Sequence, residues 1–305
     1  MNPKSLEARN SDDRPFEGMD ISSSMQLDTL ESRSPCTGCG KSRMYFCYNC
    51  YIPVSKLAGR IPICRLPIKV DIIKHQREID GKSTAAHAAV LAPQDVTVYT
   101  YPEVPDYELD KTVLLYPGTD AKTVQEFYTS ETNTMSYTEH LLAELPPGYN
   151  VGTLRTKIVN NGNNFNIHHV EKFPIDRVVL IDSTWNQSRG IYADERLQKI
   201  PKVVLQNRAS QFWRHQKGSP RWYLSTIEAL HQLLLELHLC AWGRSEHYKS
   251  NLTLPYPIHS HEDHPQCKPY SGQYDNLLFF FKFMYEKLHK LYKHEDLLSY
   301  KRPML

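Results

Sequence analysis

The sequence lacks the long apolar runs and the charge excess that would direct a chain to a membrane or a polyanion. Its longest strongly apolar run is LLFFF, at Leu277 to Phe281, which is far too short to cross a bilayer. The formal net charge is only +2, so contact with nucleic acid requires a local basic surface. We therefore expect no membrane partner and no DNA partner.

A secretory leader is also lacking, and so are internal repeats. The first 34 residues are polar and contain no apolar segment of the signal-peptide type, so they are predicted to be a disordered arm, residues 1–34. The 305 residues are 40% hydrophobic and 23% charged, which is typical of a soluble globular protein. We expect a compact cysteine segment at 35–51, followed by a catalytic domain with a C-terminal helix at 52–305.

Disulfides are not expected, because a chain without a secretory leader keeps its thiols reduced. The segment CTGCGKSRMYFCYNC places two C-x-x-C pairs seven residues apart. Four thiolates suit a closed, structural zinc site, although the spacing is shorter than in a usual zinc ribbon. The predicted ligands of this zinc knuckle are Cys36, Cys39, Cys47 and Cys50, and the alternative is a set of unligated thiols.

Strand and helix patterns alternate after residue 52, which predicts an α/β fold with a mostly parallel sheet and flanking helices. Strands are predicted at 96–101, 112–117, 178–182 and 202–206, and helical segments at 138–145 and 186–200. Ser225 and Glu228 form a capping box for a helix that stops near Gly243, and residues 275–300 are predicted to form a long last helix.

The segment VVLIDSTW, Val178 to Trp185, ends a buried-strand pattern in polar residues and an indole. Ligands of open α/β sheets bind at the carboxyl ends of the strands. Asp182 could therefore act as a general base, its pKa raised by burial, or it could cap the following helix. Trp185 could stack on a base or on a cation, or anchor a helix against the sheet.

Four segments together resemble the DTW-domain family. DSTW at 182–185 matches the D-x-T-W signature, and LLYPGTDAK at 114–122 resembles the L-L-x-P segment ending in D-A. LSTIEAL at 224–230 is similar to the L-S-T-x-E-A segment. HQRE at 75–78 is similar to H-P-x-E, with Gln76 in place of the proline. The four occur in the family's order, with the cysteine pairs upstream.

The resemblance implies a transferase that uses S-adenosylmethionine and acts on tRNA. Members move the 3-amino-3-carboxypropyl group to N3 of a uridine, here expected in the D-loop, and the implied fold is SPOUT-like and knotted in its C-terminal part. Two alternatives stay open: a SPOUT-like RNA methyltransferase, and a non-catalytic tRNA-binding zinc protein. The implied location is the nucleus or also the cytoplasm, and the oligomeric state is left open.

The resemblance also places functional residues on this chain. The catalytic residues expected from it are Asp182, Thr184 and Trp185, of which Thr184 is expected to orient the loop. The residues expected to bind the S-adenosylmethionine are Leu115, Tyr116, Pro117, Gly118, Asp120, Ser183, Leu224, Ser225 and Thr226. The loop before Thr226 is expected to offer unpaired backbone N–H groups.

Basic residues interleaved with aromatic ones predict the RNA contacts. Phe212 and Trp213 lie within the basic segment RASQFWRHQKG, a pattern typical of surfaces on which bases stack. A second basic group surrounds the H-x-x-E segment. The predicted RNA-binding residues are His75, Arg77, Lys82, Arg208 and Arg214.

Overall fold

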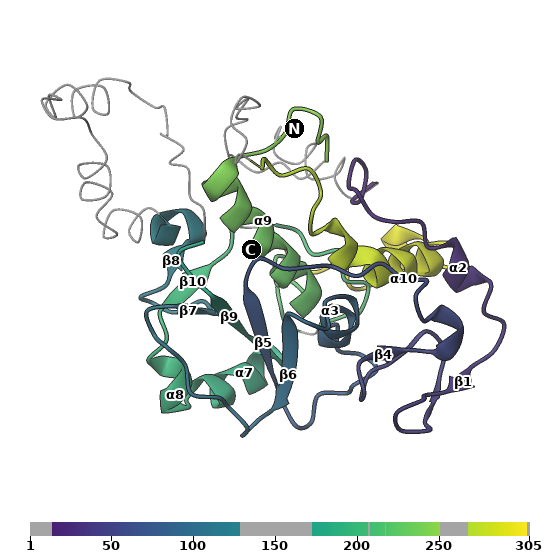
Figure 1. The fold of residues 1–305 in the computed structure, drawn as a ribbon, viewed down its shortest axis with the longest axis horizontal. Coiled ribbons are helices and arrows are strands. Elements are labelled where there is room, and N and C mark those ends of the chain that lie inside the picture. The colour runs from purple at the N-terminus through teal and green to yellow at the C-terminus, as the bar shows by residue number, and fades with distance from the viewer. Residues whose placement is uncertain (1–13, 129–172, 207, 217, 251–267, 304–305) are drawn as a thin grey trace, which may run out of the picture.

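A six-stranded parallel sheet forms the centre of the molecule (Figure 1). The computed structural model describes residues 14–128, 173–206, 208–216, 218–250 and 268–303. The strand order is β6 (Val96–Thr100), β5 (Lys69–Lys74), β9 (Arg177–Asp182), β7 (Thr112–Leu115), β10 (Lys202–Val204) and β8 (Lys122–Thr123). Every neighbouring pair is parallel. The predicted mostly parallel α/β fold is confirmed.

Helices cover both faces of the sheet, which explains why the run in β9 is apolar throughout. Val178 and Leu180 face a core shared with α3 (Ala85–Leu91), α9 (Thr226–Trp242) and α10 (Phe279–His289). Val179 faces a smaller core that includes Ile191 of α7 (Trp185–Tyr192) and Leu197 of α8 (Glu195–Gln198). In Figure 1 these two groups of helices lie on opposite sides of the strands.

The predicted helices are confirmed where the structure describes them, with one correction. Helices α7 and α8 cover most of 186–200, and α9 begins after Ser225, whose capping box with Glu228 was predicted, and is followed by Gly243. The long helix predicted for 275–300 is wrong: a 3₁₀ turn, η2 (Asp275–Leu278), precedes α10, and a second, η3 (His294–Asp296), follows it. Leu291 and Tyr292, 74% and 54% exposed, give the later residues no apolar face to bury.

Sequence patterns missed the central strand β5 and helix α3. The strand reads KVDIIK, and its buried Asp71 interrupts the apolar run. Arg177 Nη1 on the adjacent strand donates to Asp71 Oδ1 over 2.7 Å, which compensates the carboxylate. The helix predicted at 138–145 lies outside the described residues, and the knot stays a prediction.

Residues 14–34 pack against the fold, so the predicted disordered arm is wrong for this part of it. Phe16 is 7% exposed, and its ring lies 5.3 Å from that of Tyr285 on α10. The short helix α2 (Met25–Asp28) buries Leu27 completely. A few well-placed apolar side chains are enough to fix a mostly polar segment on an aromatic surface. No described helix could cross a membrane, because none combines the necessary length and hydropathy.

Candidate active site

The carboxyl ends of three neighbouring strands bring the predicted site together. In the register of the sheet, Lys74 of β5 lies beside Asp182 of β9, and Leu115 of β7 lies beside Leu180. The loops that continue from these strands are therefore neighbours at one edge of the sheet, where parallel α/β folds bind ligands. The HQRE, YPGTDA and DSTW segments thus share one end of the molecule.

Asp182 is a buried carboxylate with two hydroxyl donors. Its side chain is almost fully covered, Ser83 Oγ donates to Oδ2 over 2.7 Å, and Thr226 Oγ1 donates to Oδ1. Burial raises the pKa of Asp182 above its ordinary range, although these two hydrogen bonds and the nearby Lys74 ammonium lower it. Asp182 makes neither capping-box bond of α7, since Thr184 N donates to Gln187 Oε1 over 3.1 Å. A role as proton acceptor therefore suits it better than a role as helix cap.

Further ionisable groups surround Asp182 that sequence patterns did not single out. Burial and the Asp182 carboxylate raise the pKa of Glu78, and burial with nearby Asp80 and Asp182 raises the pKa of Tyr51 to about 12. Lys74 forms an ion pair with Asp80. Glu78 lies within the quoted HQRE segment, so the family motif was the available signal for it. Lys74 borders this segment and is predicted from the sequence only as an RNA contact, whereas Tyr51 and Asp80 follow only from the tertiary structure.

Thr184 and Trp185 begin helix α7 at the same edge. Thr184 is the exposed N-cap of the helix, which agrees with an orienting role. The half-buried Trp185 ring lies 4.1 Å from Tyr223, which in turn meets Trp222 edge-on at 4.7 Å. Trp222 is 36% exposed. This aromatic cluster combines packing with an electron-rich surface that a cation or a base can contact.

The loop after β7 makes a tight, well-anchored turn. Gly118 N donates to Tyr116 O over 2.9 Å, and the Tyr116 ring stacks on Tyr192 of α7 at 4.1 Å. A Cβ on Gly118 would lie 2.8 Å from Asp120 Oδ1 and 2.9 Å from Lys202 Cδ, so a larger residue here would displace these two side chains. The exposed Asp120 pairs with Lys202 Nζ over 2.8 Å. Pro117 is exposed, and Leu115 is half-buried.

The loop before α9 approaches Asp182 but offers fewer N–H groups than expected. Thr226 contacts the carboxylate directly, and Leu224 beside it is half-buried. The N–H groups of Ser225 and Ile227 donate to Glu228 Oε2 over 2.9 Å and to Thr84 Oγ1 over 3.1 Å. The expectation of unpaired N–H groups is therefore wrong for these two, because the capping box takes the first and Thr84, the N-cap residue of α3, takes the second. Ser225 is buried and structural.

The four cysteines converge as a metal site requires. Two small hairpins present them: β1 (Ser34–Pro35) with β2 (Ser42–Arg43), and β3 (Phe46–Cys47) with β4 (Ile52–Pro53). The sulfur atoms of Cys36, Cys39, Cys47 and Cys50 all lie within 4.8 Å of one another, with 3.6 Å between the second and third. Tetrahedral zinc with bonds of about 2.3 Å separates its sulfurs by about 3.8 Å.

Two of the four sulfurs differ in their readiness to ionise without a metal: hydrogen bonding with Cys39 and burial raise the pKa of Cys50 to about 12, whereas Cys47 favours the thiolate. Burial opposes ionisation of Cys47, but the N–H groups of Asn49 and Cys50 and the Arg43 guanidinium lower the pKa of this thiol to about 6. A thiolate is thus favoured near neutral pH, as metal binding requires. The donor set fits a closed structural zinc site.

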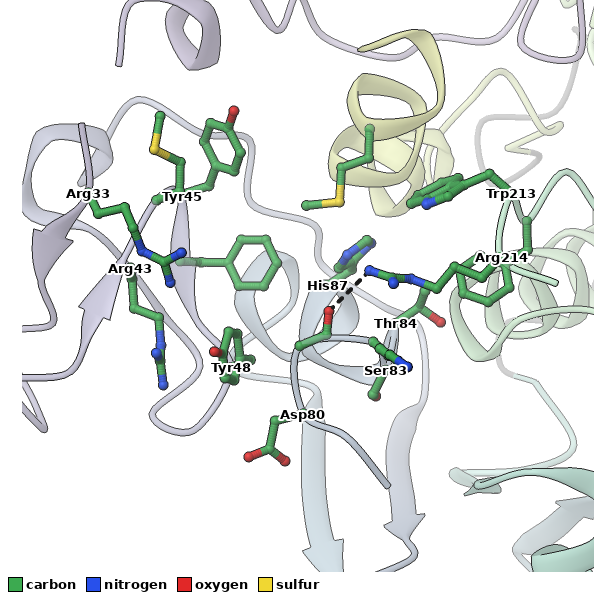
Figure 2. A pocket seen from close by; sticks show the side chains of 16 residues that line it. Arg33, Arg43, Tyr45, Tyr48, Asp80, Ser83, Thr84, His87, Trp213 and Arg214 are labelled. Carbon is green, nitrogen blue, oxygen red and sulfur yellow. Dashed lines mark hydrogen bonds between the residues drawn. The ribbon is translucent and has the colours of Figure 1, made fainter. Parts of the chain in front are cut away.

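The predicted RNA residues fall into two groups. His75, Arg77 and Lys82 share the loop after β5, and Arg214 Nη2 reaches this loop by donating to Gly81 O over 3.4 Å (Figure 2). Arg208 lies elsewhere: its Nη1 is buried with no hydrogen-bond partner among the described residues, and burial lowers the pKa of its guanidinium. This nitrogen cannot contact an RNA phosphate as predicted.

Comparison with known proteins agrees with the motifs. The DTW-domain profile matches residues 44–289. The chain is 38% identical over 270 residues to tRNA-uridine aminocarboxypropyltransferase 1 of Xenopus laevis, covering 86% of this chain and 82% of the relative. Proteins of the same name from Rattus norvegicus and Homo sapiens are 40% and 36% identical, covering 83% and 86% of this chain and 76% and 79% of the relatives. No solved structure gives a significant match. A profile that spans most of the chain shows that this protein belongs to the DTW-domain family.

Proposed function

We propose that this protein transfers the 3-amino-3-carboxypropyl group of S-adenosylmethionine to N3 of a uridine in the D-loop of tRNA. The names of its relatives support the reaction and the tRNA substrate. The observation that carries the proposal in this chain is the buried Asp182 at the end of β9, next to Trp185 and Thr226.

The reaction needs an acceptor for one proton. A bond forms between uridine N3 and the transferred carbon, the bond from that carbon to sulfur breaks, and methylthioadenosine leaves as a neutral thioether. N3 loses its proton, which Asp182 accepts. A carboxyl group whose pKa is raised holds this proton better than an exposed aspartate does. Ser83 and Thr226 orient the two carboxylate oxygens.

The donor supplies a sulfonium cation, and the residues present fit a cation. The Trp185–Tyr223 pair offers aromatic faces, and Asp182 offers a negative charge at the same strand edge. Gly118 leaves room beside it for the Asp120–Lys202 ion pair, which anchors this loop. These residues position the donor and exclude water from the reacting atoms.

The structural zinc completes the proposal for the cysteine segment. Cys36, Cys39, Cys47 and Cys50 would hold it, and a closed site of four cysteines stabilises the fold and leaves no position for substrate. The metal of the cysteine segment therefore stabilises the fold and takes no part in the transfer reaction.

Mass spectrometry of nucleosides tests the reaction. Unmodified tRNA is incubated with the full chain and S-adenosylmethionine, then digested. Aminocarboxypropyluridine together with methylthioadenosine is the expected result, and tRNA lacking its D-loop uridines should give neither. Methyluridine would contradict the proposal in favour of the methyltransferase, and unchanged tRNA that the chain still binds would favour the non-catalytic zinc protein.

We also propose that the protein works in the nucleus, with a further fraction in the cytoplasm, because tRNA is modified in both compartments. Fluorescence imaging of the tagged full chain in living cells tests this location. Exclusion of the chain from the nucleus would contradict it.

A further inference from the structure

A pocket of about 160 Å³ separates the cysteine segment from the strand ends. Figure 2 shows Arg33, Arg43 and Tyr45 on one side, and Trp213 and Arg214 on the opposite side. None of the residues expected to bind the cofactor lines it. The pocket is therefore distinct from the loops assigned to the donor.

The pocket adjoins the candidate catalytic residue. Ser83 lines it and donates to Asp182 Oδ2 over 2.7 Å. Asp80 also lines it and accepts from Asn49 Nδ2 of the cysteine segment over 2.8 Å. A group held here would lie one side chain away from Asp182.

Flat aromatic surfaces line both sides. The Tyr48 ring lies under the Arg43 guanidinium, 3.8 Å from its carbon to the ring centroid. On the other side, the half-buried Trp213 rests against Phe281 at 5.1 Å. Aromatic side chains with an adjacent arginine are the usual means of holding an unpaired base.

The charges of the lining favour an anionic ligand. Arg33, Arg43, Lys82 and Arg214 contribute four cations, whereas Asp80 is the only acidic residue of the lining and is paired with Lys74. Arg33 and Lys82 are exposed, so they can meet a phosphate without leaving the solvent. A phosphodiester on this rim would be attracted to the pocket.

A buried histidine of the lining has an unused polar atom. His87 is 4% exposed, and its Nδ1 has no hydrogen-bond partner within the described part of the chain. Burial and the nearby Arg214 lower the pKa of His87 to about 3, so the ring is neutral and can exchange a hydrogen bond with a base edge. Buried polar atoms of this kind are usually satisfied, which points to a ligand.

We infer that this pocket holds an unpaired nucleotide of the RNA substrate that neighbours the target uridine, with its base between the Arg43–Tyr48 pair and Trp213 and its phosphate at Arg33 and Lys82. The inference rests on the proposed function for its RNA ligand. It gives the cysteine segment a role in substrate recognition, because Arg43 to Phe46, between the cysteine pairs, and Tyr48, within the second pair, form one wall.

Equilibrium binding of full-length variants to fluorescent unmodified tRNA tests the inference without depending on catalysis. Tyr48→Leu should weaken tRNA binding about 10-fold, as loss of one stacked base does. The double variant Arg33→Ala with Lys82→Ala should also weaken binding. It should reduce the slope of log K against log salt concentration by about two, because two phosphate contacts are lost. Affinity for S-adenosylhomocysteine and the circular dichroism spectrum should not change.

Matched controls are Tyr292→Leu and Lys199→Ala, exposed residues that do not line the pocket, and these should bind tRNA like the wild type. Weakened tRNA binding in the pocket variants supports the inference even if the wild type forms no aminocarboxypropyluridine, so the two proposals can fail separately. Equal tRNA affinity in pocket variants and controls would overturn it. Loss of S-adenosylhomocysteine affinity in place of tRNA affinity would assign the pocket to the donor and overturn it as well.

Discussion

Asp182 owes its chemical character to residues distant in the sequence. Ser83 and Thr226, 99 and 44 positions away, direct their hydroxyls at its two oxygens. Burial raises the pKa of the carboxyl group, whereas the two hydroxyls lower it by favouring the ionised form. The net effect is a pKa above the ordinary range of aspartate, so this carboxylate holds a proton better than an exposed aspartate does.

Replacement of this acid tests its role as the base. Asp182→Asn should lower kcat by about 10²- to 10⁴-fold, because the amide cannot accept the N3 proton. S-adenosylhomocysteine affinity should stay within about twofold of the wild type, since an amide has nearly the same shape. Asp110→Asn, at an exposed position, is the control. Wild-type turnover in Asp182→Asn would remove the residue from the mechanism.

The pH profile distinguishes the effect of the hydroxyls from that of the carboxylate. Ser83→Ala removes a bond that favours ionised Asp182, so the acid limb of kcat/KM should move upward by about one pH unit. The control is Ser22→Ala, at an exposed position of the N-terminal segment that belongs to none of the predicted sites. An acid limb that stays in place in Ser83→Ala would argue against Asp182 as the titrating group.

At the scale of elements, helix α9 carries a carboxyl group in its interior. Glu236 is fully buried, and burial raises its pKa to about 7, although hydrogen bonds from Gln232 and from the backbone of Gln206 lower it. The unfolded chain releases this proton near pH 4.5. Between these two values the folded state binds more protons, so the free energy of unfolding falls as pH rises.

Glu236→Gln should remove this dependence. The variant should be more stable than the wild type above pH 7, by up to about 3 kcal/mol, and similar to it below pH 4.5. Urea unfolding at pH 4.5, 6 and 8 measures the difference. Parallel stability curves for the two proteins across this range would show that Glu236 is ionised in the folded state.

The cysteine segment is an element whose order depends on its metal. We expect one zinc per chain, and a chelator should unfold residues 36–50 because two-residue strands cannot bury a core of their own. Hydrogen exchange should then rise in this segment while β5 and β9 stay protected. Zinc-free protein with unchanged exchange and circular dichroism would contradict the metal site.

At the scale of the whole molecule, a buried aspartate at the start of η2, Asp275, links several segments that lie far apart in the sequence. Asp275 accepts from His231 of α9 over 2.9 Å, from Tyr248 over 2.8 Å and from Tyr270 over 2.7 Å. Asp20 N adds a bond of 2.8 Å from the N-terminal segment. Burial opposes ionisation, but these donors lower the pKa of Asp275, so its contribution to stability is lost as pH falls below about 4.

Replacement of Asp275 should destabilise all the segments that donate hydrogen bonds to it. Asp275→Ala should lower the free energy of unfolding by about 3–5 kcal/mol, because it leaves buried donors unpaired. The exposed Asp28, 3.9 Å from Lys287, is the control, and Asp28→Ala should change stability by less than about 0.5 kcal/mol. Chemical denaturation at pH 7 compares the two. Equal stabilities would show that the network is dispensable.

The sequence by itself determined those features that depend on near neighbours along the chain. Apolar runs predicted β9, β7 and β10, a capping box predicted α9, and paired cysteines predicted the metal site. Each of these patterns lies within a segment of about 20 residues, so periodicity and spacing along the chain are enough to predict it. Strand β5 was missed because Asp71 breaks its apolar run, and the partners that compensate this buried carboxylate, Arg177 and Tyr107, lie far from it in the sequence.

Only the tertiary structure decided which residues surround Asp182 and the predicted binding sites. The sheet register sets Lys74 beside Asp182, and packing turns Arg208 inward while it brings the cysteine segment opposite Trp213. The same packing brings Thr84 Oγ1 to the N–H group of Ile227 at the start of α9 and holds Phe16 against α10. These contacts join residues far apart in the chain, and their energies depend on burial, which a local pattern does not contain.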